Sequence, residues 1–190
     1  MNNPLETIFL DLDGVCCQWW ETAIKLFPTA PPVPERGPLP YWVSEHIGVH
    51  KDVVDLAVDE SGSDWWANLP EYPWFMHLYN SLVRFGPKVV FLTASGHFKH
   101  APNGKLKWLQ NRLGERFDDF VITRHKHLLA HPRAVLIDDS PSMIQRFSEA
   151  GGQTVMFPQR WNELHEYAAN PLIHTLMEVK KLVPFHPDQT

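Results

Sequence analysis

Five short apolar runs alternate along the chain with segments of helical periodicity. The runs span residues 5–10, 88–93, 119–124, 134–139 and 153–157, and each is apolar nearly throughout and rich in β-branched residues. This pattern is typical of parallel strands covered on both faces. Residues 104–114 have leucines at helical spacing and end on a glycine, and residues 140–152 begin with Ser-Pro and end on two glycines, as helices do. The alternation predicts a doubly wound α/β parallel sheet with right-handed crossovers.

The connection between the first two predicted strands is far longer than one crossover needs. It contains helical stretches at residues 19–27, 51–60 and 73–85, with a proline-rich segment after the first of them. We therefore expect residues 1–17 and 86–190 to form the α/β core and residues 18–85 to form an inserted helical cap. The tail after Pro158 is expected to add helices, including residues 171–183, that pack on the core.

Polar side chains follow the carboxyl ends of four predicted strands. They are Asp11 with Asp13, Thr93, Arg124, and Asp138 with Asp139. In open α/β sheets, ligands bind beyond these strand ends. Neighbouring carboxylates repel each other, and burying them is costly unless a cation or a proton compensates. Capping or loop solvation explains many isolated aspartates but not two acidic pairs that directly follow apolar strands, so the pattern predicts a metal site or a catalytic site.

Composition and charge limit the classes of partner. The chain has 190 residues, 44% hydrophobic and 21% charged, which is ordinary for one globular unit with an insertion. A formal net charge of −5 disfavours binding to a nucleic-acid polymer. The N-terminus lacks the pattern of an export signal and no apolar run reaches membrane-spanning length, so we expect a cytoplasmic protein that does not enter a membrane. Cys16 and Cys17 are adjacent, which favours reduced thiols over a disulfide.

Four sequence motifs occur in a characteristic order. "DLDGV", "FLTAS", Lys105 and "LIDDSP" together resemble the motifs of the haloacid dehalogenase-like (HAD-like) phosphohydrolase superfamily, whereas a DxDG motif alone would be weak evidence. The resemblance implies a Rossmann-type core, Mg²⁺ as cofactor and an aspartyl-phosphate intermediate. Asp11 would attack phosphorus as the nucleophile, and Asp13 would protonate the leaving oxygen and later deprotonate water.

The same resemblance assigns metal and phosphate ligands. The metal ligands would be the Asp11 carboxylate, the Asp13 backbone carbonyl and Asp139, with Asp138 bonding to a metal-bound water; which of the last two binds directly is open. Phosphate oxygens would be held by Thr93 and the amide of Ala94, and Lys105 would neutralise developing charge and orient Asp11. Taken alone, Lys105 would be a solvated lysine at a helix start. For Arg124 and Lys126, structural ion pairing and contact with substrate phosphate are weighed equally.

A narrower resemblance concerns the cap. "YWVSEHIG" (residues 41–48) and "WWANLPEYP" (residues 65–73) are similar to cap segments of the 5'(3')-deoxyribonucleotidases. The likeness places Trp19, Tyr41 and Trp42 at base-binding positions, although each tryptophan alone is more typical of a core. An aromatic residue of that family near Asp59 is missing, and Trp65 or Trp66 would have to replace it.

These observations predict a Mg²⁺-dependent phosphomonoesterase acting on a small phosphomonoester, namely a nucleoside monophosphate. The alternatives are a sugar phosphate or a phosphoprotein as substrate, and a non-catalytic module that binds Mg²⁺ and phosphate. A homodimer is left open. The eleven histidines, including "RHKHLLAH" and "GHFKH", lack the accompanying pattern of a zinc site, so loop positions are favoured for them.

Overall fold

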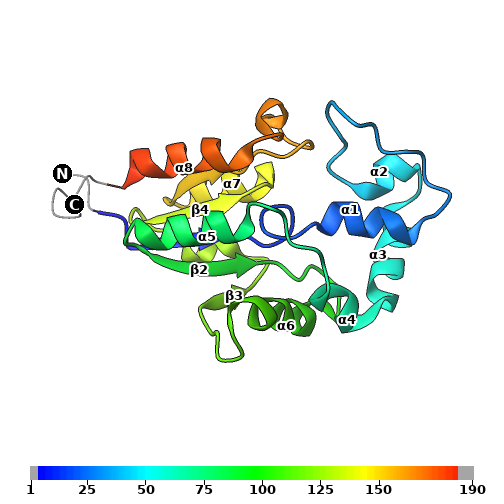
Figure 1. The fold of residues 1–190 in the computed structure, drawn as a ribbon, viewed down its shortest axis with the longest axis horizontal. Helices are drawn as coiled ribbons and strands as arrows, with labels where there is room; N and C mark the ends of the chain where they lie inside the picture. Colours follow the sequence, from blue (N-terminus) through cyan, green and yellow to red (C-terminus); the bar gives the residue numbers. More distant parts are fainter. Residues whose placement is uncertain (1–3, 184–190) are drawn as a thin grey trace.

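A five-stranded parallel sheet forms the centre of the computed structural model, which describes residues 4–183 (Figure 1). The strands lie in the order β3-β2-β1-β4-β5, and each neighbouring pair is parallel. Their bounds are Thr7–Leu10 (β1), Lys88–Thr93 (β2), Phe120–Ile122 (β3), Ala134–Asp138 (β4) and Gln153–Met156 (β5). The predicted fold class is therefore confirmed.

Helices cover both faces of the sheet, which explains why the strands are apolar nearly throughout. One face carries α5 (Phe75–Arg84), α6 (Ala101–Leu113) and α8 (Pro171–Leu182), and the other carries α7 (Pro141–Glu149) and the 3₁₀ helix η2 (Lys126–Leu129). On the first face the ring of Phe75 packs against Phe91 and Trp108, with centroids 6.3 and 5.0 Å apart. On the second, Phe147 packs edge-on against Phe9 at 6.1 Å.

The segment between β1 and α5 contributes four short helices and a 3₁₀ turn. They are α1 (Trp19–Ala23), η1 (Ile24–Leu26), α2 (Val43–Ile47), α3 (Lys51–Glu60) and α4 (Gly62–Ala67). Figure 1 shows α1, α2 and α3 at the right, beyond the end toward which the β2 arrow points. These helices therefore overlie the carboxyl edge of the sheet, while α4 packs against α6.

The helix α5 differs from the expected division at residue 85. Its apolar side chains Phe75, Leu78 and Leu82 are fully buried, and α5 packs against β2 and α8. Burial of this face against the sheet places α5 with the core elements, so the segment that stands away from the sheet ends before Phe75. The amphipathic pattern alone could not show which apolar surface the helix would cover.

The tail and the thiols follow the expectations. After β5 the chain forms η3 (His165–Tyr167) and then α8, which packs on α5 and β5. Cys16 and Cys17 are free and buried. Within residues 4–183, no helix has both the length and the apolarity needed to cross a membrane.

Candidate active site

Three aspartates meet at the carboxyl edge of the sheet. Asp11 follows β1, Asp138 ends the neighbouring strand β4, and Asp139 comes next in the chain. One carboxylate oxygen from each lies within 4.8 Å of the others, and all three residues are buried. The pairing of β1 with β4 thus brings Asp11 to the Asp138–Asp139 pair, which is far away in the sequence.

One lysine contacts two of the three carboxylates. Lys126 Nζ lies 2.7 Å from both Asp11 Oδ1 and Asp138 Oδ2. The first contact is an ion pair without hydrogen-bond geometry, so buried Asp11 Oδ1 keeps no hydrogen-bond partner among the described residues. Asp138 Oδ1 accepts from the Ser140 amide at 2.9 Å. With one ammonium among three carboxylates, this oxygen-only donor set fits a hard divalent ion such as Mg²⁺.

Burial raises the pKa values of two of these carboxyls. Burial raises the pKa of Asp138 to about 6, although the charge of Lys126 opposes the shift. Burial, followed by the charge of Asp138, raises the pKa of Asp139 well above its ordinary value. A bound divalent cation would reverse both shifts, because it favours the ionised carboxylates.

Lys105 faces the second aspartate of the DLDGV motif. It is buried within α6, and its ammonium donates to Asp13 Oδ2 at 2.6 Å, Thr93 Oγ1 at 2.8 Å and the Ala94 carbonyl at 2.6 Å. Burial raises the pKa of Asp13, and the positive charge of Lys105 works against it. The expected contact of Lys105 with Asp11 is not found; Lys126 lies there instead. The alternative for Lys105 taken alone, a solvated lysine at a helix start, does not hold, because its side chain is 2% exposed.

The backbone conformation and the neighbours of Gly14, in the DLDGV motif, require a glycine at this position. Gly14 has a φ of +79°, a conformation that L side chains rarely adopt. A Cβ atom there would lie 2.5 Å from Asp139 Oδ2 and 2.8 Å from its Cγ. Close approach of the backbone at Gly14 therefore allows the Asp139 carboxylate to reach the acidic cluster.

A single cavity of about 360 Å³ lies over this edge. Of the residues predicted as site residues, its lining includes Asp11, Asp13, Thr93, Ala94, Arg124, Lys126, Asp138, Asp139, Trp19, Tyr41 and Trp42. Lys105 lies beneath it, through its contacts with Asp13 and Thr93. The volume is in the range of small-molecule sites in proteins.

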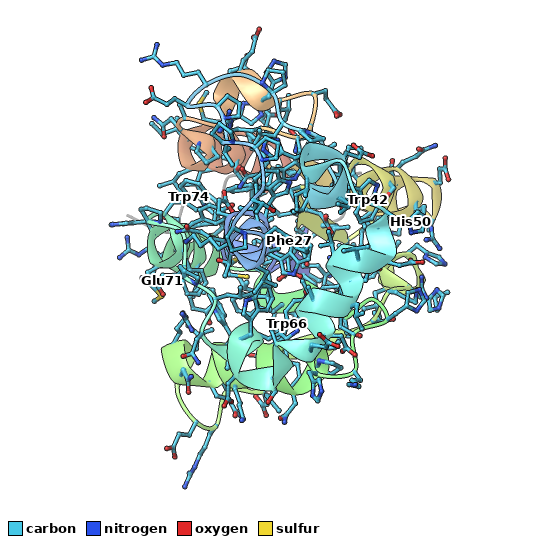
Figure 2. The ribbon with its side chains drawn as sticks, turned by 90° about the vertical axis from the view of Figure 1, so that its right-hand side faces the viewer. Phe27, Trp42, His50, Trp66, Glu71 and Trp74 are labelled. Carbon is cyan, nitrogen blue, oxygen red and sulfur yellow. The ribbon has the colours of Figure 1, made fainter. Side chains whose placement is uncertain are left out.

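Aromatic side chains from the inserted segment form the opposite wall. Trp42 is 44% exposed and packs edge-on against Tyr41, with centroids 4.8 Å apart. Trp66 is buried, also lines the cavity, and has the Lys105 ammonium 5.2 Å from its ring centroid. Figure 2 places Trp42 near α2 and Trp66 on α4, so the two rings come from different parts of the inserted segment. Burial, then the charge of Asp139, raises the pKa of Tyr41.

Three side chains of the loop after β5 were missed by the sequence reasoning. Trp161 Nε1 donates to Asp139 Oδ2 at 2.5 Å, Asn162 Nδ2 to the Asp139 carbonyl at 2.9 Å, and Gln159 Nε2 to the Gly14 carbonyl at 2.5 Å. The sequence feature that could have identified these residues is their position just past the carboxyl end of the fifth predicted strand. Applying the strand-end rule to residues 153–157 would have identified them.

The histidines within residues 4–183 lie outside the acidic cluster. His97 lines the cavity, and the rings of His125 and His127 lie 5.9 Å apart beside η2. Within residues 4–183, the group of His, Cys, Asp and Glu side chains close enough to share an ion is Asp11 with Asp138 and Asp139.

Comparison with known proteins gives a fold but no sequence family. No protein-family model matches this chain, and no curated protein matches its sequence. Among solved structures, a predicted phosphatase from Clostridium acetobutylicum has a TM-score of 0.60 at 14% identity, covering 95% of this chain and 100% of the other. A haloacid dehalogenase-like family hydrolase from Xanthomonas campestris has a TM-score of 0.55 at 12% identity, covering 95% and 96%.

A third structure adds a bound sugar bisphosphate. It is CbbY from Rhodobacter sphaeroides in complex with xylulose-(1,5)bisphosphate, with a TM-score of 0.55 at 16% identity, covering 95% of this chain and 100% of the other. Similarity at this level of identity concerns the fold, and function has to be argued from the site itself. The chain has the α/β fold of HAD-like hydrolases.

Proposed function

We propose that the protein is a Mg²⁺-dependent phosphomonoesterase of the HAD-like type that hydrolyses nucleoside monophosphates. The observation that carries this proposal is the arrangement at one end of the cavity. There, the Asp11 carboxylate lies beside Asp138 and Asp139, and the Asp13 carboxylate accepts a hydrogen bond from Lys105, which also donates to Thr93. The residues proposed as nucleophile, as acid and as donors to phosphate oxygens therefore lie at one edge of the sheet.

The metal would be held by Asp11, Asp139 and the Asp13 backbone carbonyl. Asp138 is the weaker candidate for direct contact, because Lys126 and the Ser140 amide already engage both of its carboxylate oxygens. When bound, Mg²⁺ supplies charge that lets an anionic nucleophile approach an anionic phosphate. Lys126 and Trp161 would keep Asp11, Asp138 and Asp139 in position.

The reaction follows from the positions of the two motif aspartates. Asp11 attacks phosphorus, and the bond from phosphorus to the ester oxygen breaks as the new P–O bond forms. Asp13 gives its proton to the leaving oxygen, and its raised pKa favours the protonated form needed for this step. Asp13 then takes a proton from water, which attacks the aspartyl-phosphate and releases phosphate.

Three further groups would stabilise the transferred phosphoryl group. Thr93 and the amide of Ala94 would donate to its oxygens, and Lys105 would balance the charge that develops on them. Because Lys105 also contacts Asp13, the same ammonium orients the acid. Lys126 is engaged with Asp11 and Asp138, which favours the ion-pairing alternative for this residue.

The aromatic wall favours a nucleoside as the leaving group. Trp19, Tyr41 and Trp42 line the cavity and offer flat faces on which a base can stack. A sugar phosphate remains the second candidate, because CbbY, which shares the fold, binds xylulose-(1,5)bisphosphate. A non-catalytic binding module is disfavoured, since such a module would not need Asp13 as an acid.

The decisive experiment is phosphate release from a panel of nucleoside and sugar monophosphates, with and without Mg²⁺. Nucleoside monophosphates should give the highest kcat/KM, and Asp11→Asn should abolish turnover while the circular dichroism spectrum is retained. Appreciable turnover by Asp11→Asn would exclude Asp11 as the nucleophile. Higher kcat/KM for sugar phosphates would mean that the substrate is a sugar phosphate, and would leave the proposed phosphatase activity unchanged.

Trp42→Ala tests the base-binding wall directly. Loss of one stacking face should raise KM for nucleotides roughly tenfold and change KM for p-nitrophenyl phosphate far less. Equal effects on both substrates would remove the assigned role of Trp42.

A further inference from the structure

The cavity lining contains four cationic side chains, and they differ in how they are paired. Lys126 is buried between Asp11 and Asp138, and Lys51 forms an ion pair with Asp55 on α3. The other two are Arg124, just past β3, and Arg146 on α7. Neither arginine forms an ion pair with a carboxylate of residues 4–183.

The two arginines come from neighbouring elements. The short helix η2, which starts two residues after Arg124, packs against α7. Arg146 Nη2 lies 3.2 Å from His127 Nδ1, so the partner of its guanidinium is an imidazole ring and not a carboxylate. Both arginines line the cavity, and an arginine without an acidic partner attracts anions even in a protein with a net charge of −5.

Both arginines lie at the open side of the cavity and not at its buried end. Thr93 and Asp138 at the buried end are 0% and 1% exposed, whereas Arg124 and Arg146 are exposed. A phosphoryl group attacked by Asp11 has to reach the buried end. The arginines are therefore placed to meet another part of the same substrate.

We propose that Arg124 and Arg146 form a subsite for a second phosphate group, carried by the leaving group of the substrate. This inference rests on the proposed function, because it takes the buried end as the site of phosphoryl transfer. Guanidinium groups bind phosphate oxygens through paired, charge-assisted hydrogen bonds, and two of them match the charge of a phosphate dianion. Among the nucleotides of the proposed function, the preferred substrate would then be one with a second phosphate, a nucleoside bisphosphate, with one phosphate cleaved as a monoester and the other bound at the open side.

The test compares a nucleoside 3',5'-bisphosphate with the corresponding 5'-monophosphate. The wild type should prefer the bisphosphate in kcat/KM, and Arg124→Ala and Arg146→Ala should each lower this preference about tenfold, mainly through KM. The matched control is Arg116→Ala, which removes an exposed arginine outside the cavity lining and should leave the preference unchanged. Melting temperatures identify any variant that is misfolded. If one arginine variant is misfolded, the other variant tests the second phosphate subsite.

Calorimetry separates this inference from the phosphatase proposal. In an Asp11→Asn background, binding of the bisphosphate should weaken about tenfold when Arg146→Ala is added. If the wild type hydrolyses no phosphomonoester, the proposed function fails, and the binding measurement still decides the role of the arginines. If every arginine variant lowers kcat/KM for the bisphosphate and for the monophosphate by the same factor, the second subsite is overturned. The proposed phosphatase activity is not affected by that result.

Discussion

Lys105 Nζ lies 2.6 Å from Asp13 Oδ2 across 92 positions of sequence. The contact links α6 to the loop after β1 and continues to Thr93 at the end of β2. Because the ammonium is buried and has three oxygen partners, its position is determined by packing and not by solvent. This arrangement couples the acid–base residue to the groups that would hold phosphate.

Replacing Lys105 with methionine should lower kcat by roughly 10²- to 10³-fold, because the variant loses the charge that balances the transferred phosphoryl group. Lys107→Met is the matched control. Lys107 is two residues away on the same helix, with its side chain 47% exposed and its ammonium near Asp64. Steady-state kinetics on one phosphomonoester measures kcat for both variants. Similar losses in the two variants would mean that the effect comes from α6 as a whole.

The pH dependence of turnover should report the protonation of Asp13. Burial raises the pKa of this carboxyl above its ordinary value of 3.8, so the protonated acid persists to higher pH than usual. The kcat/KM for alkyl phosphates should then fall as pH rises through the raised pKa. Asp13→Asn should lower kcat/KM, which reports the first step, roughly 10²- to 10⁴-fold for alkyl phosphates and much less for p-nitrophenyl phosphate, whose leaving group needs no proton. An equal loss on both esters would contradict the assignment.

Stability without metal should fall as the solution becomes less acidic between about pH 4 and pH 6. Burial raises the pKa of Asp138 from 3.8 to about 6, so the folded chain binds this proton more tightly than the unfolded chain. The resulting stabilisation is complete below the unfolded pKa and is lost as pH rises through the folded pKa. Urea unfolding in EDTA across this range measures the slope.

Saturating Mg²⁺ should stabilise the ionised site and reverse that trend. At a hundred times Kd the ion would add about 2.7 kcal/mol, and Asp139→Asn should remove most of the gain. A melting temperature that is insensitive to Mg²⁺ at pH 7 would argue against a metal site at the three aspartates.

Two glycine variants separate backbone strain from crowding. Gly37→Ala should cost about 1–2 kcal/mol of unfolding free energy through its φ of +90° alone, since its Cβ would meet nothing within 4 Å. Gly14→Ala shares the positive φ but also places a methyl group against Asp139, which should add about 1–3 kcal/mol. It should also weaken Mg²⁺ binding. Equal costs would show that the Asp139 carboxylate moves aside freely.

Some features of the protein followed from local sequence. Strands 134–139 and 88–93 were predictable because apolar β-branched runs have few other conformations available when buried. The meeting of Asp11 with Asp138 and Asp139 was predictable too, since parallel strands deliver their carboxyl ends to one edge.

Other features depended on packing between distant elements. No local pattern could show that Lys126, rather than Lys105, would lie against Asp11, because both lysines come from elements that reach the same edge. The placement of α5 on the sheet and the hydrogen bond from Trp161 to Asp139 likewise arise from tertiary packing. Periodicity and strand order specify which edge a side chain reaches, but the partner of a buried charge is decided by distances that exist only after the chain has folded.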